Sequence, residues 1–235
     1  MQTPSLQEHL EAVRKIRQGL PDTPLIQTVF SPLTVLLFIV GRSAYVTETV
    51  FGIGQPVTLE SLFKEHRAAA HHALHAIALT LADYVQELRQ AGSDGLFYAV
   101  TGTAHPGLFD EAMFDELSRP YDSIVLEAAS YGKKIFLHTC GAHAQPAKFN
   151  DYRIDGISWD TVAEGNPGLD ADLKATKVGG VDHGLFAGND LEQIEQQAKE
   201  ALAKMKGQPF ILSPNCAIPL TVTDEALVHF KKTQY

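Results

Sequence analysis

The residues best suited to chemistry are the two cysteines of the chain and one histidine beside the first of them. Cys140 lies two residues after His138 in an apolar run, and Cys216 follows a second apolar run, 210–214, with 75 residues between the two cysteines. Zinc in proteins is bound by cysteine sulfur and histidine nitrogen, and sites with three protein ligands are typical of catalysis. We therefore predict a zinc site of His138, Cys140 and Cys216, with water or a substrate thiol in the fourth position. The alternative is that the cysteines are small buried hydrophobic residues.

The surrounding sequence alternates apolar strand-like runs with amphipathic helical segments, which predicts a parallel sheet with crossover helices. The predicted strands are 24–30, 95–99, 134–138, 155–158, 177–181 and 209–213. The predicted helices are 6–20, a short one from residue 32, 58–91, helices across 108–131, 168–175, 190–206 and 223–232. Doubly wound sheets and TIM barrels share this pattern. No Gly-x-Gly-x-x-Gly motif follows the first strand, so a dinucleotide-binding fold has no support.

In both architectures the chemistry gathers at the carboxyl ends of the strands. His138 and Cys140 are two residues apart, so on an extended backbone they face the same way. Further polar side chains follow other strands, and we predict catalytic or substrate roles for His105, Asp160, Asp182 and His183. The histidines could instead be hydrogen-bonded loop residues, and the aspartates could cap helices or orient a ligand histidine.

Length and charge limit the function classes. The chain of 235 residues is long enough for one domain, 1–235, and its net charge of −9 argues against nucleic-acid and anionic-membrane partners. The most apolar run, 32–40, is too short to span a bilayer, and the start of the chain has no signal-peptide pattern, so we expect a cytoplasmic protein. The cluster His71-His72-His75 on the long predicted helix is interpreted as a solvated or packed face.

Four motifs at the strand ends, in this order, resemble the uroporphyrinogen decarboxylase superfamily. They are Leu137-His138-Thr139-Cys140-Gly141, Ile154-Asp155-Gly156-Ile157-Ser158-Trp159-Asp160, Val178-Gly179-Gly180-Val181-Asp182 and Ile211-Leu212-Ser213-Pro214-Asn215-Cys216-Ala217-Ile218-Pro219. Two further matches are Phe30-Ser31-Pro32-Leu33-Thr34 and Ala91-Gly92-Ser93-Asp94-Gly95. The resemblance implies a TIM barrel. It also implies the branch of corrinoid-dependent methyltransferases, in which a His-x-Cys and a distant Cys bind zinc and zinc activates a thiol to accept a methyl group.

On this resemblance we expect a zinc-dependent methyltransferase-like protein with a small thiol substrate and methylcobalamin, held by a corrinoid protein, as methyl donor. The chain departs from the family in two ways: Asn215 stands where glycine usually precedes the cysteine, and the family's first two strands have no counterpart. The decarboxylase arginine and aspartate motifs belong to that part. We therefore expect an incomplete, TIM-barrel-like fold of six β/α units, covered by a second copy or a partner chain. The alternative is a uroporphyrinogen decarboxylase-like protein of other or no activity, a truncated or split subunit.

Overall fold

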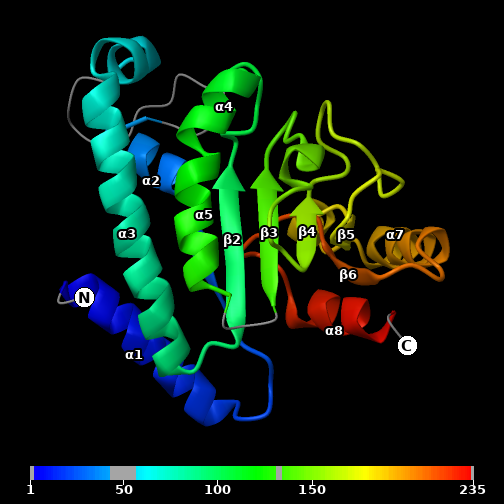
Figure 1. The fold of residues 1–235 in the computed structure, drawn as a ribbon. Coiled ribbons are helices and arrows are strands. Elements are labelled where there is room, and N and C mark those ends of the chain that lie inside the picture. Colours follow the sequence, from blue (N-terminus) through cyan, green and yellow to red (C-terminus); the bar gives the residue numbers. More distant parts are fainter. Residues whose placement is uncertain (1–2, 43–56, 131–133, 234–235) are drawn as a thin grey trace.

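A computed structural model describes residues 3–42, 57–130 and 134–233. Its centre is a six-stranded parallel sheet in which the strands follow one another in chain order (Figure 1). The strands are β1 (Ile26–Phe30), β2 (Gly95–Thr101), β3 (Ile135–Cys140), β4 (Gly156–Trp159), β5 (Thr176–Val181) and β6 (Phe210–Pro214). All six predicted strands are thus confirmed.

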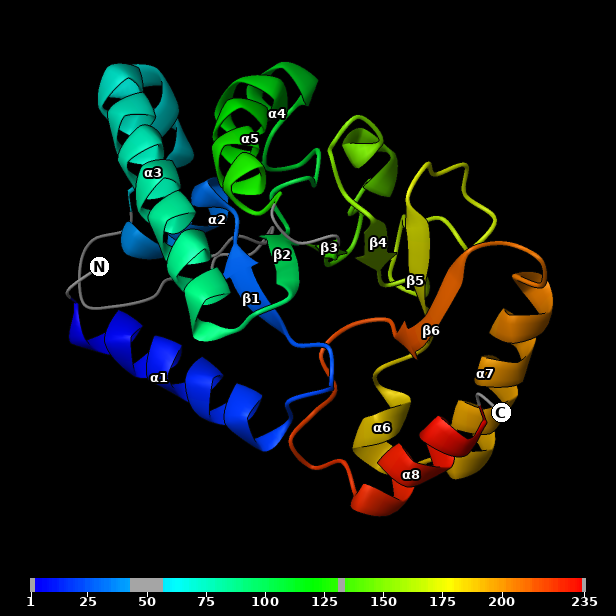
Figure 2. The same cartoon turned by 60° about the horizontal axis from the view of Figure 1, so that its bottom comes forward.

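The helices lie on the outer face of the curved sheet, as crossover connections require. Figure 2 shows the strands following an arc, with α3 and α5 outside β1 to β3 and α7 outside β5 and β6. The α-helices are α1 (Pro4–Gly19), α2 (Pro32–Ile39), α3 (Arg67–Ala91), α4 (Glu111–Leu117), α5 (Arg119–Ala128), α6 (Leu185–Gly188), α7 (Leu191–Lys204) and α8 (Asp224–Lys232). A π-helical turn, η1 (Ser61–Glu65), precedes α3, and a 3-10 turn, η2 (Pro146–Phe149), follows β3.

Local sequence signals explain the helix ends. Ser31 caps α2 by accepting a hydrogen bond from the Thr34 amide, and Pro32 occupies the first turn, where its missing N–H costs nothing. Gly92 ends α3 in the left-handed conformation, with φ of 107°, that glycine adopts at a helix terminus. Thr223 caps α8 in the same way as Ser31 caps α2, as predicted.

One predicted helix is wrong. Residues 168–175 form turns and bends, so β4 and β5 are joined without a crossover helix. The segment bonds to a distant side chain: the Asn150 amide oxygen accepts from the Lys174 N–H, and its NH₂ group donates to the Asp172 carbonyl. Competing contacts of this kind override a weak local preference for helix. Residue 131, at the end of the predicted 108–131 helices, lies outside the described residues.

The core lies mainly between the sheet and the helices α1 to α5. Fully buried leucines from α2, α3 and β2 meet there, among them Leu37, Leu74 and Leu96. A second, smaller cluster, around Phe186 and Ile194, packs the last helices against β5. No helix among the described residues has both the length and the apolar character needed to cross a membrane.

The parallel register aligns one residue from every strand in a single row. The pairs run from Phe30 of β1 through the neighbouring strands to β6, and the row is Phe30, Ala99, His138, Ser158, Val178 and Ile211. Each strand pairs with its sequence neighbours, so β1 and β6 each have one partner strand among the described residues. The fold is therefore an incomplete TIM-barrel-like sheet, as predicted.

Candidate metal centre

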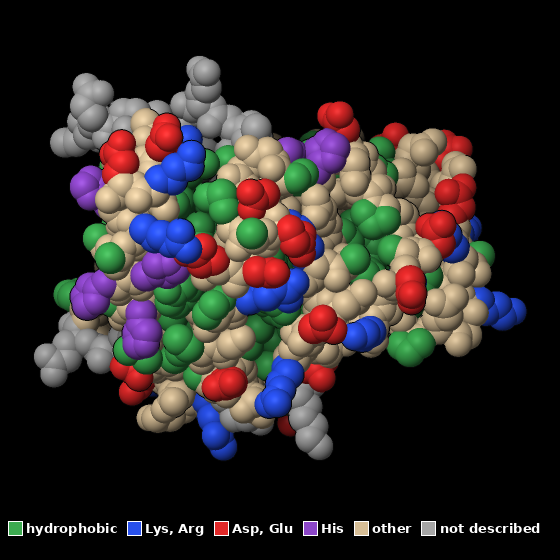
Figure 3. All heavy atoms as spheres, turned by 45° about the horizontal axis from the view of Figure 1, so that its top comes forward, with side chains coloured by type: hydrophobic (Ala, Val, Ile, Leu, Met, Phe, Trp, Pro, Cys, Tyr) green, Lys and Arg blue, Asp and Glu red, His purple; other side chains and the backbone are tan. Residues whose placement is uncertain are grey.

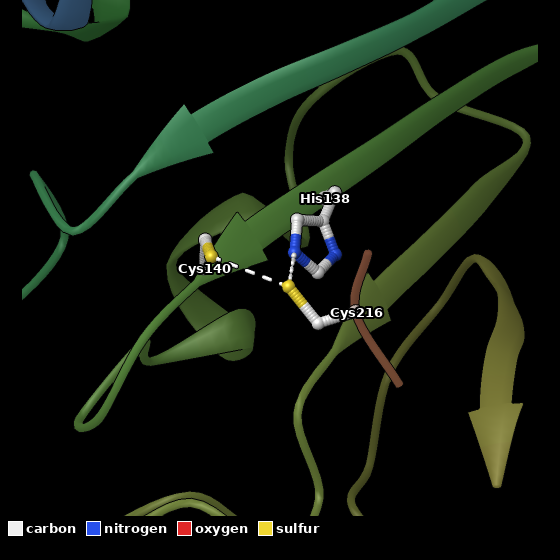
Figure 4. A group of neighbouring side chains, drawn as sticks. All are labelled: His138, Cys140 and Cys216. Carbon is white, nitrogen blue, oxygen red and sulfur yellow. Dashed lines mark hydrogen bonds between the residues drawn. The ribbon is translucent and has the colours of Figure 1, made fainter. Parts of the chain in front are cut away.

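Three predicted ligands meet where β3 and β6 end. Cys140 is the last residue of β3, His138 lies two positions before it, and Cys216 follows β6 (Figure 4). One ligand atom from each lies within 4.8 Å of the others. The Cys216 sulfur is 3.6 Å from the Cys140 sulfur and 3.5 Å from Nε2 of His138. The inference that spacing alone could not establish, that Cys216 approaches from another strand, is thus borne out.

These separations suit zinc. Bond lengths of about 2.3 Å to sulfur and about 2.0 Å to nitrogen in a tetrahedron place two sulfurs about 3.8 Å apart and sulfur and nitrogen about 3.5 Å apart. The observed 3.6 and 3.5 Å are close to both values. Two soft sulfurs and an imidazole also form a donor set that zinc prefers over magnesium or calcium. Among the described residues, this is the group of His, Cys, Asp or Glu side chains with metal-binding geometry.

His138 is held in the orientation that a ligand needs. It is paired in register with Ser158 of β4, and its Nδ1 lies 3.1 Å from the Ser158 hydroxyl. That contact leaves Nε2 directed at Cys216. The Phe97 ring stacks on the imidazole with centroids 5.7 Å apart and planes at 21°. Neighbours of this kind fix the tautomer and ring orientation of metal-binding histidines.

Cys216 is positioned by the residue before it. Asn215 is fully buried; its N–H donates to the Val181 carbonyl over 2.7 Å, and its amide oxygen accepts from the Gly180 N–H over 2.8 Å. Its NH₂ group donates to Oδ1 of Asp160 and to the Thr161 hydroxyl. The residue that departs from the family's usual glycine therefore connects β6 with the ends of β4 and β5. A glycine has no side chain with which to make these bonds.

The environment of Cys216 favours a protonated thiol in the absence of a cation. The neighbouring Cys140 thiol and burial raise the pKa of the Cys216 thiol far above its ordinary value, and the Asp160 charge adds to the increase. A metal ion would reverse this preference, because a coordinating thiol is deprotonated outright.

A cavity of about 500 Å³ opens beside the three ligands. Its walls come from the inward-facing positions of the strands and are mostly apolar. The lining residues are Thr28, Phe30, Phe38, Phe97, Ala99, Thr101, His138, Cys140, Ser158, Val178, Ser213, Pro214, Cys216 and Ala217. A cavity of this size and character suits a small organic molecule.

Three of the four other predicted site residues form a group behind Cys216. Nδ1 of His183 lies 3.7 Å from a carboxylate oxygen of Asp160 and 3.8 Å from one of Asp182. That nitrogen is buried and has no hydrogen-bond partner within the ordinary distance. Asp182 also accepts from the Gly184 N–H, as a turn-forming aspartate does. None of the three is among the residues that line the cavity, and their catalytic roles stay predictions.

The fourth residue, His105, lies in the loop after β2 and faces a histidine that the sequence argument passed over. Its ring centroid is 4.8 Å from that of His143, and its Nδ1 accepts from the Gly107 N–H. Burial and the nearby His143 lower the pKa of His105. His143 has a φ of 48° and packs directly against Gly165. Its place three residues after Cys140 is the signal that could have pointed to it. A role for His105 in the reaction also stays a prediction.

The histidine cluster on α3 lies on the outer surface, as interpreted from the sequence. His71 is half-buried, and its two ring nitrogens contact the Tyr121 hydroxyl at 2.6 Å and the Glu116 carboxylate at 2.7 Å. His72 and His75 are exposed. Figure 3 shows histidine side chains gathered on the α3 side of this face of the molecule. The group belongs to the packing of α3 against α5.

Fold and site together define an incomplete TIM-barrel-like protein with three metal-binding side chains at the carboxyl ends of its strands. The model of the uroporphyrinogen decarboxylase (URO-D) family matches residues 1–233, so the chain belongs to this family. No protein with a curated functional description matches the sequence closely enough to count as a relative.

Solved structures with the same fold include two named for methyl transfer. A methyltransferase from Methanosarcina mazei is 20% identical with a TM-score of 0.73, over 96% of this chain and 62% of that one. A B12-independent methionine synthase from Shewanella sp. W3-18-1, in complex with selenomethionine, is 14% identical with a TM-score of 0.59, over 95% of this chain and 63% of that one. The chain thus spans less than two thirds of the length of these neighbours.

Proposed function

We propose that the protein is a zinc-dependent methyltransferase that activates a small thiol to accept a methyl group from a corrinoid, methylcobalamin, carried by a partner protein. One observation carries the proposal: His138, Cys140 and Cys216 converge beside an apolar cavity. This donor set leaves one position open for the sulfur of a substrate.

When bound, a zinc ion supplies the positive charge that keeps a substrate thiol deprotonated and nucleophilic. The other contributions come from the chain. Cys140 and Cys216 provide two negative sulfurs, and Ser158 keeps Nε2 of His138 directed at the ligand group. The apolar wall excludes water and holds the sulfur near the methyl donor.

In the proposed reaction the thiol loses its proton and its sulfur forms a new bond to the methyl carbon. The bond between methyl carbon and cobalt breaks at the same time, and its electron pair stays on the corrinoid. Nothing is oxidised by an outside reagent. His105, Asp160, Asp182 and His183 are proposed to assist in this reaction from the loops around the site.

The comparisons support the methyltransferase side of the family. Two of the similar folds are named a methyltransferase and a methionine synthase, although the second is named B12-independent. The corrinoid is therefore the part of the proposal that most needs a direct assay.

Elemental analysis and a methyl-transfer assay test the proposal together. We expect one zinc per chain in the purified protein, loss of zinc in a Cys140→Ala, Cys216→Ala double variant, and unchanged zinc in a Ser213→Ala control on the same cavity wall. Methylcobalamin absorbance should decay only when thiol and zinc-loaded protein are both present. Unchanged zinc in the double variant would contradict the site. Decarboxylation of a porphyrinogen without methyl transfer would favour the decarboxylase alternative.

A further inference from the structure

We infer that the thiol accepted at this site is neutral and apolar, and that thiols with an anionic tail are excluded. The inference rests on the proposed function, because it names the class of thiol that the same centre takes. It is drawn from the wall of the cavity and from the charges around it.

The cavity wall has no charged partner for an anionic group. Among the described residues that line it, none is Lys, Arg, Asp or Glu. The polar members are hydroxyls and the metal-binding side chains themselves. Phe30 and Phe97 supply aromatic surface, and Phe97 stacks on the ligand His138. A carboxylate or sulfonate placed here would lose hydration without gaining a cation, and unpaired charge is costly in an apolar site.

The cations nearest in sequence to the wall are directed elsewhere. Lys177 precedes the cavity residue Val178 in β5, so its side chain leaves the opposite face of the sheet. Its Nζ donates to the Leu169 carbonyl over 2.8 Å. Lys148, in the loop after β3, lies 3.3 Å from the Glu111 carboxylate and over the Phe114 ring. Neither side chain is free to turn toward the cavity without breaking these contacts.

The charges that do lie near the site are negative. Two cysteine thiolates and the thiolate of a substrate together outweigh the charge of one zinc ion. Asp160, whose side chain is only 13% exposed, is bonded to Asn215 next to Cys216. A second negative group on the substrate would add repulsion in a region of low dielectric, where a unit charge acts strongly. A neutral tail avoids this repulsion and gains apolar contact instead.

The test measures thiol binding to the metal without any methyl donor. The protein is loaded with cobalt(II), and the thiolate-to-cobalt absorption is titrated with 3-mercaptopropionate, its methyl ester and 1-butanethiol. Each apparent Kd is corrected for the pKa of the free thiol. We expect the ester and 1-butanethiol to bind at least about tenfold more tightly than the acid, as a unit charge near an anionic centre implies.

A cation installed in the wall provides the second arm. Thr28 is an exposed cavity residue on β1. In a Thr28→Lys variant the preference for the ester should shrink by about tenfold, whereas a Thr28→Met control of similar length should keep it. Equal or tighter binding of the acid to the unmodified protein would overturn the inference, as would an unchanged preference in Thr28→Lys. Absence of any thiol-dependent absorption would instead overturn the proposed function.

Discussion

The side-chain amide of Asn215 donates to Oδ1 of Asp160 over 3.2 Å, which ties the residue before one cysteine ligand to the end of β4. The same amide oxygen accepts from Gly180, whose φ of 111° is one that glycine adopts readily. Position 215 therefore fixes the backbone from which Cys216 projects. We interpret Asn215 as a positioning residue for the metal centre.

Replacing Asn215 with alanine should weaken zinc binding by about 10- to 100-fold, the usual effect of removing a residue that orients a metal ligand. It should also lower the free energy of unfolding by about 1–3 kcal/mol, because buried partners lose their hydrogen bonds. Chelator competition and denaturant titration measure the two effects. Asn150→Ala is the matched control: it removes an amide that bonds the 172–174 segment, so it should lower stability and leave zinc affinity unchanged. Equal zinc affinity in both variants would show that Asn215 is merely structural.

Ser158 is expected to set the orientation of His138 through the 3.1 Å contact with Nδ1. Ser158→Ala should therefore weaken zinc binding by about tenfold or more while leaving the fold intact. Ser213→Ala removes another hydroxyl from the same cavity, one whose hydrogen bond is to the Pro214 carbonyl, and should have no such effect. Competition with a chromophoric chelator compares the two variants. A similar loss in both would mean that the cavity as a whole, rather than the Ser158 contact, governs affinity.

The ligand set was within reach of sequence reasoning because it depends on short-range geometry. His138 and Cys140 are two residues apart on a strand, so they had to share a face once the strand was recognised. Cys216 could be added because carboxyl ends of parallel strands meet at one edge. The two residues that support the ligands could not be assigned in the same way. Ser158 reaches His138 only through the register of β3 with β4, and apolar runs this short do not specify register.

Tertiary contacts account for what the sequence argument missed. Residues 168–175 have helical spacing, yet hydrogen bonds from Asn150 hold part of the segment in turns. Asn215 could be recognised only as a departure from the family pattern, since its partners on β4 and β5 are far away in the chain. His143 was passed over because its neighbour His105 comes from the loop after a different strand.

Asp122 gives a prediction on pH dependence. It is fully buried and accepts hydrogen bonds from the hydroxyls of Tyr98, Ser118 and Tyr152. Burial raises the pKa of Asp122, although these hydroxyls oppose the increase. The folded state thus holds this proton more tightly than the unfolded state, so the contribution is present below the ordinary carboxyl pKa and is lost as pH rises through the raised value.

Replacing Asp122 with asparagine should remove this contribution, so that the free energy of unfolding falls less steeply with pH across that acidic window. Denaturant titrations at a series of pH values, with zinc removed from all samples, give the slope. Asp83→Asn, at an exposed position of α3, is the control and should keep the slope of the unmodified protein. A slope that is the same in Asp122→Asn as in the control would mean that Asp122 does not titrate differently in the two states.

The two ends of the inward-facing row predict association. Phe30 on β1 is 40% exposed and Ile211 on β6 is 43% exposed, and both lie on strands with a single partner. Unpaired edges with apolar side chains invite pairing with another chain, and a lysine on the edge opposes it. We expect concentration-dependent self-association in sedimentation velocity at low micromolar concentration, weakened by about tenfold or more in Ile211→Lys. Val162→Lys changes an apolar residue that is 57% exposed away from the strand edges and should leave association unchanged. A compact monomer at every concentration would show that these edges need no partner.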